Sequence, residues 1–173
     1  VGSSNKCIRG VPGISFIVLS NDVVDVFSNR RRVLYYNDLL NHLTLEDGGQ
    51  TPFTPPIQVM YAFREALLEL IEEGLQNRIS NYRKIADLLR DNIVDLGLKL
   101  LFNRGLYSNT MTSVIIPEGL SYSVLHDRLR EMEFLIYKSQ GKIASNTFRI
   151  GTVGLIAETD IMGFSNALGQ VIS

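Results

Sequence analysis

The chain has 173 residues, of which 45% are hydrophobic and 20% are charged, and its formal net charge is −1. This composition is typical of one globular domain, or of a domain with part of another, and the near-zero charge gives no field that would draw the chain to nucleic acid or to an anionic membrane. No apolar run is long enough to cross a bilayer. The single cysteine excludes an intramolecular disulfide and fits a reducing compartment, so we expect a cytoplasmic protein.

The first 56 residues are predicted to form the end of an α/β domain and an irregular passage that leads out of it. Residues 3–13 are rich in small side chains and end in a turn of two glycines and a proline. Residues 14–19 are almost uniformly apolar, which predicts a strand buried on both faces, as in a parallel sheet. Residues 21–32 are polar and end in a triple arginine at 30–32, which we interpret as a solvated turn.

The clearest irregular segment is residues 46–56, which contain two glycines and three prolines. Prolines and glycines at this density forbid regular structure. Before this segment, the mixed spacing of leucines in residues 33–45 is weakly helical. After it, Thr54 is placed to cap a helix and Pro55 suits the first helical position.

A connecting helix is predicted over residues 57–75. Its apolar side chains recur on one face, with glutamates and a glutamine largely opposite, and Gly74 is a plausible stop. The residues expected on the buried face are Val59, Phe63, Leu67, Leu70 and Ile71.

Residues 76–173 are predicted to form a small, complete C-terminal α+β domain, an antiparallel sheet with helices on one face. Helices are expected at 76–96, 121–133 and 158–172, and strands at 98–102, 110–116, 135–138 and 147–153. Ser121 is placed to cap the second of these helices.

Three motifs resemble one family. Residues 4–13, Ser-Asn-Lys-Cys-Ile-Arg-Gly-Val-Pro-Gly, resemble the lysine segment of class V (fold type I) pyridoxal-phosphate aminotransferases, and among these the segment of the 2-aminoethylphosphonate–pyruvate transaminases. Arg9 stands where that family usually has glutamine. Phe53-Thr54 resembles the family's Phe-Thr-Ser-Pro, although two prolines follow here. Residues 148–154, Phe-Arg-Ile-Gly-Thr-Val-Gly, resemble its Phe-Arg-Ile-Gly-Asn-Ile-Gly.

The resemblance implies the fold and the reaction. It spans the whole chain but corresponds only to the C-terminal half of such an enzyme: the end of the large parallel-sheet domain, followed by a small α+β domain. The implied cofactor is pyridoxal 5′-phosphate, and the implied reaction converts 2-aminoethylphosphonate and pyruvate to phosphonoacetaldehyde and alanine. The implied partners are a small amino donor and a keto acid, with the parent enzyme a homodimer whose site is shared between subunits.

Three residues carry roles by this resemblance. Lys6 would form the Schiff base with the cofactor and then act as the base of the proton shift, because only a neutral amine attacks a carbonyl. Thr54 would offer its hydroxyl to the cofactor phosphate of the neighbouring subunit. Arg149 would clamp the carboxylate of the substrate or keto acid. From the residues alone, a surface lysine, a helix cap and a structural ion pair remain the alternatives.

Other possibilities are weaker. Cysteine desulfurases of the same class use a cysteine far along the chain from the lysine, so we interpret Cys7 as a buried packing residue. His42 and His126 are too far apart in sequence to indicate a metal pair. An alanine–glyoxylate or serine–pyruvate type aminotransferase is the alternative enzyme. A non-catalytic folded fragment is the alternative for this chain by itself, because the chain opens on Val1, a few residues before its lysine motif.

Overall fold

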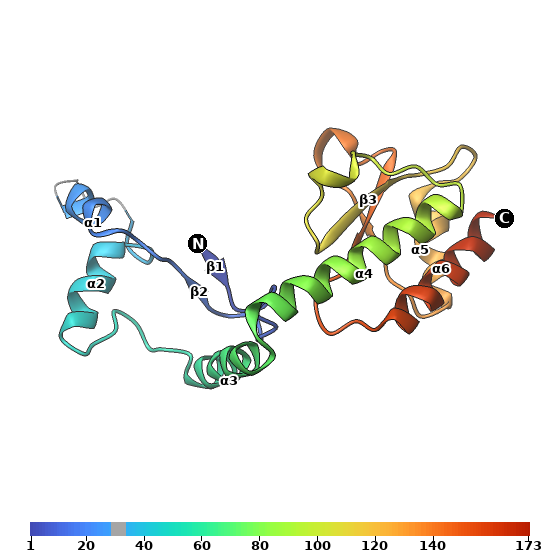
Figure 1. The fold of residues 1–173 in the computed structure, drawn as a ribbon. Coiled ribbons are helices and arrows are strands. Elements are labelled where there is room, and N and C mark those ends of the chain that lie inside the picture. The colour runs from blue at the N-terminus through green and yellow to red at the C-terminus, as the bar shows by residue number, and fades with distance from the viewer. Residues whose placement is uncertain (29–33) are drawn as a thin grey trace. The chain divides into compact units, whose positions relative to one another are not determined.

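The computed structural model describes residues 1–28 and 34–173, which form two compact units, Val1–Leu68 and Glu69–Ser173 (Figure 1). The boundary falls inside one continuous helix. The predicted turn of arginines at 30–32 lies outside the described residues. Each unit is described by itself below.

The first unit opens with a two-stranded antiparallel sheet. Strands β1 (Gly2–Ser3) and β2 (Ser15–Phe16) pair with each other in register. The prediction of a doubly buried parallel strand over 14–19 is wrong: Ile17 and Val18 are 42% and 83% exposed. Among the described residues the run pairs only with Gly2–Ser3, and Phe16 packs on Phe63 while Ile17 and Val18 stay exposed. The run is therefore not covered on both faces, as a strand of a parallel sheet is.

Two short helices follow, α1 (Asn21–Ser28) and α2 (Leu39–Asp47). Residues 21–28, described from the sequence only as polar, are helical, and the Ser20 carbonyl accepts the first backbone hydrogen bonds of α1 from the Val23 and Val24 amides, at 3.1 and 3.3 Å. The weak helical pattern of 33–45 is confirmed with later bounds. Asp38 caps α2, and its side chain accepts a hydrogen bond from the Asn41 amide at 3.2 Å.

The helix predicted over residues 57–75 is present as α3 (Ile57–Glu73), which begins at the predicted residue and ends two residues earlier. It ends before Gly74, whose φ of 83° lies in the left-handed region that glycine tolerates best. Ile71, expected on the buried face, is 76% exposed. The other four expected residues are partly buried: Val59, Phe63, Leu67 and Leu70.

The second unit contains a three-stranded antiparallel sheet in the order β3-β5-β4. The strands are β3 (Met111–Ile115), β4 (Tyr137–Lys138) and β5 (Thr147–Gly151). The helices are α4 (Leu75–Asp95), α5 (Tyr122–Glu131) and α6 (Glu158–Ile172), with short 3-10 turns η1 (Arg104–Leu106) and η2 (Gly141–Ile143). The strand expected at 98–102 reduces to one bridge, Leu100 to Val114.

The core of this unit lies between the sheet and its helices. In Figure 1, α4 and α6 lie side by side, and α5 packs against α6. The cluster of buried side chains draws on α4, α5 and α6 and on β3 and β5, and it includes Leu89, Ile93, Val114, Leu125, Leu129, Phe148, Ile150 and Leu168. Helices on one face of an antiparallel sheet are thus confirmed. Among the described residues, no helix is long and apolar enough to cross a membrane.

Candidate active site

The loop that carries Lys6 is fixed by its own backbone. The Arg9 amide donates to the Lys6 carbonyl at 2.9 Å, and the Gly10 amide donates to the Ser4 carbonyl at 2.8 Å. The buried Ser4 hydroxyl donates to the Val11 carbonyl at 2.6 Å. Arg9 adopts a φ of 66°, a left-handed conformation that is costly for a side chain other than glycine. These bonds hold the loop in one shape and leave the Lys6 side chain outside it.

The same loop is seated on helix α3 within the first unit. A Cβ at Gly13 would lie 3.1 Å from Val59 Cγ1, so the backbone approaches the helix as closely as glycine allows. The rings of Phe16 and Phe63 stack with their centroids 5.8 Å apart. Packing against α3 therefore supports the loop, in addition to the hydrogen bonds within the loop itself.

The Lys6 side chain is exposed, and the described part of the chain records no hydrogen bond or ion pair for its amine. An amine that no carboxylate engages is available to a carbonyl compound. The neighbouring Cys7 is also exposed, so its interpretation as a buried packing residue is wrong.

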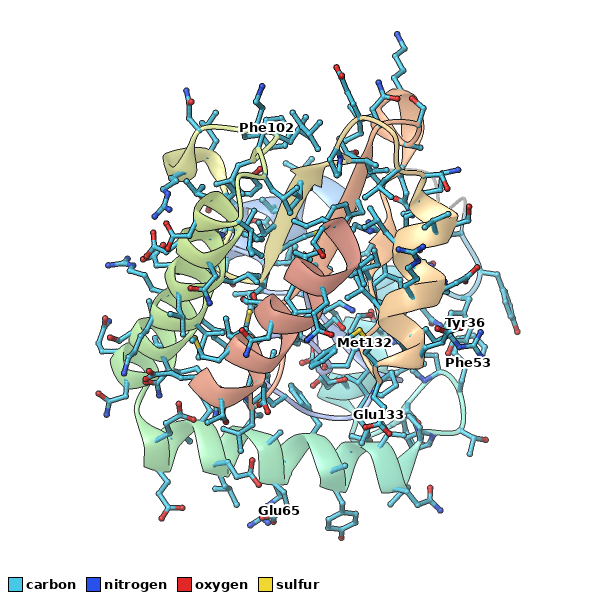
Figure 2. All side chains as sticks on the ribbon, turned by 90° about the vertical axis from the view of Figure 1, so that its right-hand side faces the viewer. Tyr36, Phe53, Glu65, Phe102, Met132 and Glu133 are labelled. Carbon is cyan, nitrogen blue, oxygen red and sulfur yellow. The ribbon has the colours of Figure 1, made fainter. Side chains whose placement is uncertain are left out.

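Thr54 follows a cluster of aromatic rings centred on Phe53. Tyr36 stacks on Phe53 with ring centroids 4.7 Å apart, and Tyr35 meets the same ring edge-on at 5.7 Å. Tyr36 and Phe53 are labelled next to each other in Figure 2. A ring nitrogen of His42 lies 3.1 Å from the Tyr36 carbonyl oxygen and ties helix α2 to this cluster. The backbone that presents Thr54 is thus held by ring packing on one side.

Thr54 is not the cap of α3, and the prediction that it would be one is wrong. The helix begins at Ile57, and its first carbonyl bond runs from the Met60 amide to the Pro56 carbonyl at 3.0 Å. A residue before proline is kept out of the helical region, so Pro55 cannot begin a helix while Pro56 follows it. The Thr54 side chain is exposed, and no hydrogen bond of its hydroxyl is recorded among the described residues.

Arg149 lies on the central strand β5, on the face opposite to the core. Its neighbours Phe148 and Ile150 are buried in the core cluster, and side chains alternate between the two faces of a strand. The structural ion pair that residue types alone would favour is absent from the described residues: no carboxylate contacts the half-buried Arg149 guanidinium. A guanidinium in this setting is a ready partner for an anion.

The chain after Arg149 is held in place by three hydrogen bonds. The Thr152 amide donates to the Thr110 carbonyl at 3.0 Å, and the Thr152 hydroxyl donates to the Asn109 carbonyl at 3.1 Å. The Gly154 amide donates to the hydroxyl of Tyr82 on α4 at 3.3 Å. The sequence predicts a helix over residues 76–96, but no sequence pattern pairs Tyr82 with Gly154, so this contact could not be predicted.

The chemical groups of Lys6, Thr54 and Arg149 suit the cofactor that the motifs imply. The amine of Lys6, the hydroxyl of Thr54 and the guanidinium of Arg149 are the groups that such a reaction needs, and none of them has a recorded partner among the described residues. Lys6 and Thr54 lie in the first unit and make no hydrogen bond with each other there, and Arg149 lies in the second.

Comparison with known proteins gives a consistent result. No family model matches the chain. In sequence, the chain is 37% identical over 165 residues to the 2-aminoethylphosphonate–pyruvate transaminase of Bacillus thuringiensis (strain Al Hakam), a match that covers 93% of this chain and 45% of that protein. The transaminase of the same name from Bacillus cytotoxicus is 36% identical over the same length. The chain thus spans less than half the length of these relatives.

Solved structures agree with the sequence relatives. An alanine–glyoxylate aminotransferase from Nostoc sp. superposes with a TM-score of 0.90 at 27% identity, covering 99% of this chain and 47% of that one. A ureidoglycine–glyoxylate aminotransferase from Bacillus subtilis superposes with a TM-score of 0.83 at 28% identity, covering 99% and 46%. Sequence and fold together identify the chain as a relative of the class V, fold type I aminotransferases. Within that class, its matched sequence relatives are the 2-aminoethylphosphonate–pyruvate transaminases.

Proposed function

We propose that the whole protein containing this chain is a pyridoxal-phosphate-dependent transaminase that converts 2-aminoethylphosphonate and pyruvate to phosphonoacetaldehyde and alanine. The observation that carries the proposal is the Lys6 loop: a fixed turn with an exposed, unengaged amine, in a sequence 37% identical over 165 residues to a transaminase of that name. Pyridoxal phosphate, when bound, supplies the electron sink for moving an amino group.

In this proposal Lys6 has two tasks. Its Nζ would hold the cofactor covalently between turnovers. When not bonded to the cofactor, the same Nζ would be an amine base for a proton on the substrate carbon that carries nitrogen. A rigid loop suits both tasks, since the amine must return to the same position in every cycle.

Thr54 and Arg149 are proposed to bind the anionic groups. The Thr54 hydroxyl would donate to the cofactor phosphate of the neighbouring subunit in a homodimer. It is the available donor there, because the two prolines that follow it have no amide hydrogen. The Arg149 fork would hold the carboxylate of pyruvate and the acidic group of the amino donor with two parallel hydrogen bonds.

The test uses the full-length protein that contains this chain. Phosphonoacetaldehyde formation is measured with 2-aminoethylphosphonate and pyruvate, for the native protein and for Lys6→Ala. We expect the substitution to abolish turnover and the visible absorbance of the lysine-bound cofactor. Lys99→Ala, at an exposed lysine of the second unit, is the control and should leave both unchanged. Undiminished turnover in Lys6→Ala would refute the assignment of Lys6.

A second substrate pair has support from the fold. The alanine–glyoxylate aminotransferase from Nostoc sp. covers nearly the whole chain with a TM-score of 0.90. A panel of amino donors (2-aminoethylphosphonate, alanine and serine) against pyruvate and glyoxylate decides between the two. A higher kcat/KM for alanine with glyoxylate than for 2-aminoethylphosphonate with pyruvate would favour the second candidate.

For this chain by itself we propose weak cofactor binding and no turnover. The division proposed is residues 1–56 as the end of the cofactor-binding domain with its exit passage, 57–75 as the connecting helix and 76–173 as the small domain. The family's aspartate for the pyridine nitrogen and its phosphate loop come from the region before the lysine. Adding pyridoxal phosphate to the isolated chain tests this, since a stable visible band would contradict it.

A further inference from the structure

Arg149 has two neighbours in register on the face of the sheet that the core helices leave open. Ser113 on β3 and Tyr137 on β4 pair directly with Arg149 on either side of the central strand. Directly paired residues point to the same face with Cβ atoms roughly 5 Å apart. Ile136, just before Tyr137, is buried in the core, which confirms that the tyrosine faces the other way. We call Ser113, Tyr137 and Arg149 the cross-sheet row.

Tyr137 has an available hydroxyl. Its side chain is 58% exposed, and the described residues record no hydrogen bond or ring contact for it. Other tyrosines of the second unit are engaged: the hydroxyls of Tyr107 and Tyr122 donate to backbone carbonyls at 2.7 and 3.1 Å. Tyr137 therefore lies beside the Arg149 guanidinium, and neither group has a hydrogen-bond partner within the described part of the chain.

The number of oxygens on an anion decides how many donors it needs. The planar guanidinium donates two parallel hydrogen bonds, which satisfy the two oxygens of a carboxylate. A phosphonate has a third oxygen, out of the plane of that fork. The Ser113 hydroxyl is one bond from its Cβ and stays low on the sheet, whereas a tyrosine hydroxyl extends about as far from the sheet as an arginine head group. A tyrosine hydroxyl can donate one hydrogen bond.

We propose that Tyr137 determines specificity for a phosphonate over a carboxylate, by donating a hydrogen bond to the third oxygen of a phosphonate held by Arg149. The inference rests on the proposed function, since it extends the site in which Arg149 binds the substrate anion. In this proposal the Tyr137 hydroxyl, on the edge strand β4, distinguishes the phosphonate of the amino donor from the carboxylate of the keto acid.

The experiment compares Tyr137→Phe with Tyr61→Phe in the full-length protein. Tyr61 is an exposed tyrosine on α3 with no recorded hydrogen bond, so it matches the chemical change away from the cross-sheet row. We expect Tyr137→Phe to lower kcat/KM for 2-aminoethylphosphonate by about tenfold or more, as for a hydrogen bond to a charged group. The KM for pyruvate and the cofactor absorbance should change less than about twofold. Equal losses for both substrates, or no loss, would overturn the proposal.

Binding of simple anions separates this inference from the proposed function. Methylphosphonate and acetate are titrated into the native protein, Tyr137→Phe and Arg149→Lys. Binding is followed by calorimetry in all three, and also by the NMR signal of the Arg149 side-chain NH in the two proteins that keep this arginine. We expect Arg149→Lys to weaken both anions and Tyr137→Phe to weaken methylphosphonate alone. This pattern supports the role of Tyr137 even if neither proposed substrate is turned over. Methylphosphonate binding that is unchanged in Tyr137→Phe contradicts it even if the transaminase activity is established.

Discussion

The guanidinium of Arg90 on α4 donates to the hydroxyl of Thr112 on β3 at 3.2 Å, in the interior of the second unit. A second nitrogen of Arg90 donates to the Ser108 carbonyl at 2.6 Å, and the guanidinium lies over the Tyr107 ring at 4.9 Å from its centroid. Burial lowers the pKa of Arg90, while the nearby Asp87 carboxylate acts in the opposite sense. Through this side chain, α4 fixes the segment that leads into β3.

Replacing Arg90 with lysine should destabilise the second unit by about 2 kcal/mol, because the ammonium cannot keep the planar, forked set of contacts and leaves buried acceptors unpaired. The free energy of unfolding, measured by urea denaturation, checks this. Arg83→Lys, at an exposed position of the same helix, is the control and should change the stability by less than about 0.5 kcal/mol. A loss no larger than that of the control would show that Arg90 is dispensable.

Two predicted helix caps should behave differently. The Ser121 side chain accepts a hydrogen bond from the Val124 amide at 3.3 Å and caps α5, whereas Thr54 caps nothing. Ser121→Ala should therefore cost about 1 kcal/mol of unfolding free energy. Thr54→Ala should leave the melting temperature unchanged but weaken cofactor binding by the full-length protein. A marked fall in the melting temperature of Thr54→Ala would restore its role as a cap.

The lysine loop should be sensitive to Gly13. Its φ of 133° is a conformation that side chains rarely adopt, and an added Cβ would press on Val59. We expect Gly13→Ala to cost about 1–3 kcal/mol locally and to speed amide hydrogen exchange in residues 3–13. Gly105→Ala, where a Cβ meets open space, should leave the exchange of its own segment unchanged. Unaltered exchange around Lys6 in Gly13→Ala would mean that the loop does not depend on this close approach.

Removing one buried hydroxyl of the second unit, that of Ser139, should increase its stability. Among the described residues, Ser139 Oγ is the buried side-chain polar atom without a hydrogen-bond partner. Ser139→Ala should stabilise the unit by about 1 kcal/mol, since an unsatisfied buried group costs that much or more. Ser165→Ala is the matched control. Ser165 is buried, donates to the Ile161 carbonyl at 2.8 Å and accepts from Asn92 at 3.0 Å, so its loss should destabilise the unit.

Much of the second unit could be predicted because its signals are local. Helical periodicity placed α4, α5 and α6 to within a few residues, and Ser121 marked the start of α5. The strand predicted over 147–153 is present as β5, and alternation along it puts Arg149 on the opposite face from Phe148 and Ile150. These patterns depend on neighbours a few residues away, and the packing of the unit agrees with them.

The first unit was harder to predict because the burial of its segments depends on partner segments that local sequence patterns do not reveal. The apolar run at 14–19 has the composition of a buried strand, but burial needs partner strands, and only Gly2–Ser3 pairs with it among the described residues. The start of α3 at residue 57 was predicted, but Thr54 was wrongly predicted to cap it, because Pro56 keeps Pro55 out of the helical region and this outweighs the capping pattern. The contact between Tyr82 and Gly154 joins positions 72 residues apart, beyond the reach of any sequence period.

The alternation along β5 also protects the site against one kind of folding error. If β5 slipped by a single residue against β3 and β4, the core would receive the Arg149 guanidinium and lose Phe148 and Ile150. Such a state would bury an unpaired charge and expose two large apolar side chains, so it would be sparsely populated. The native register is therefore enforced by the hydrophobic core itself, and every stably folded copy of this unit presents Arg149 on its open face.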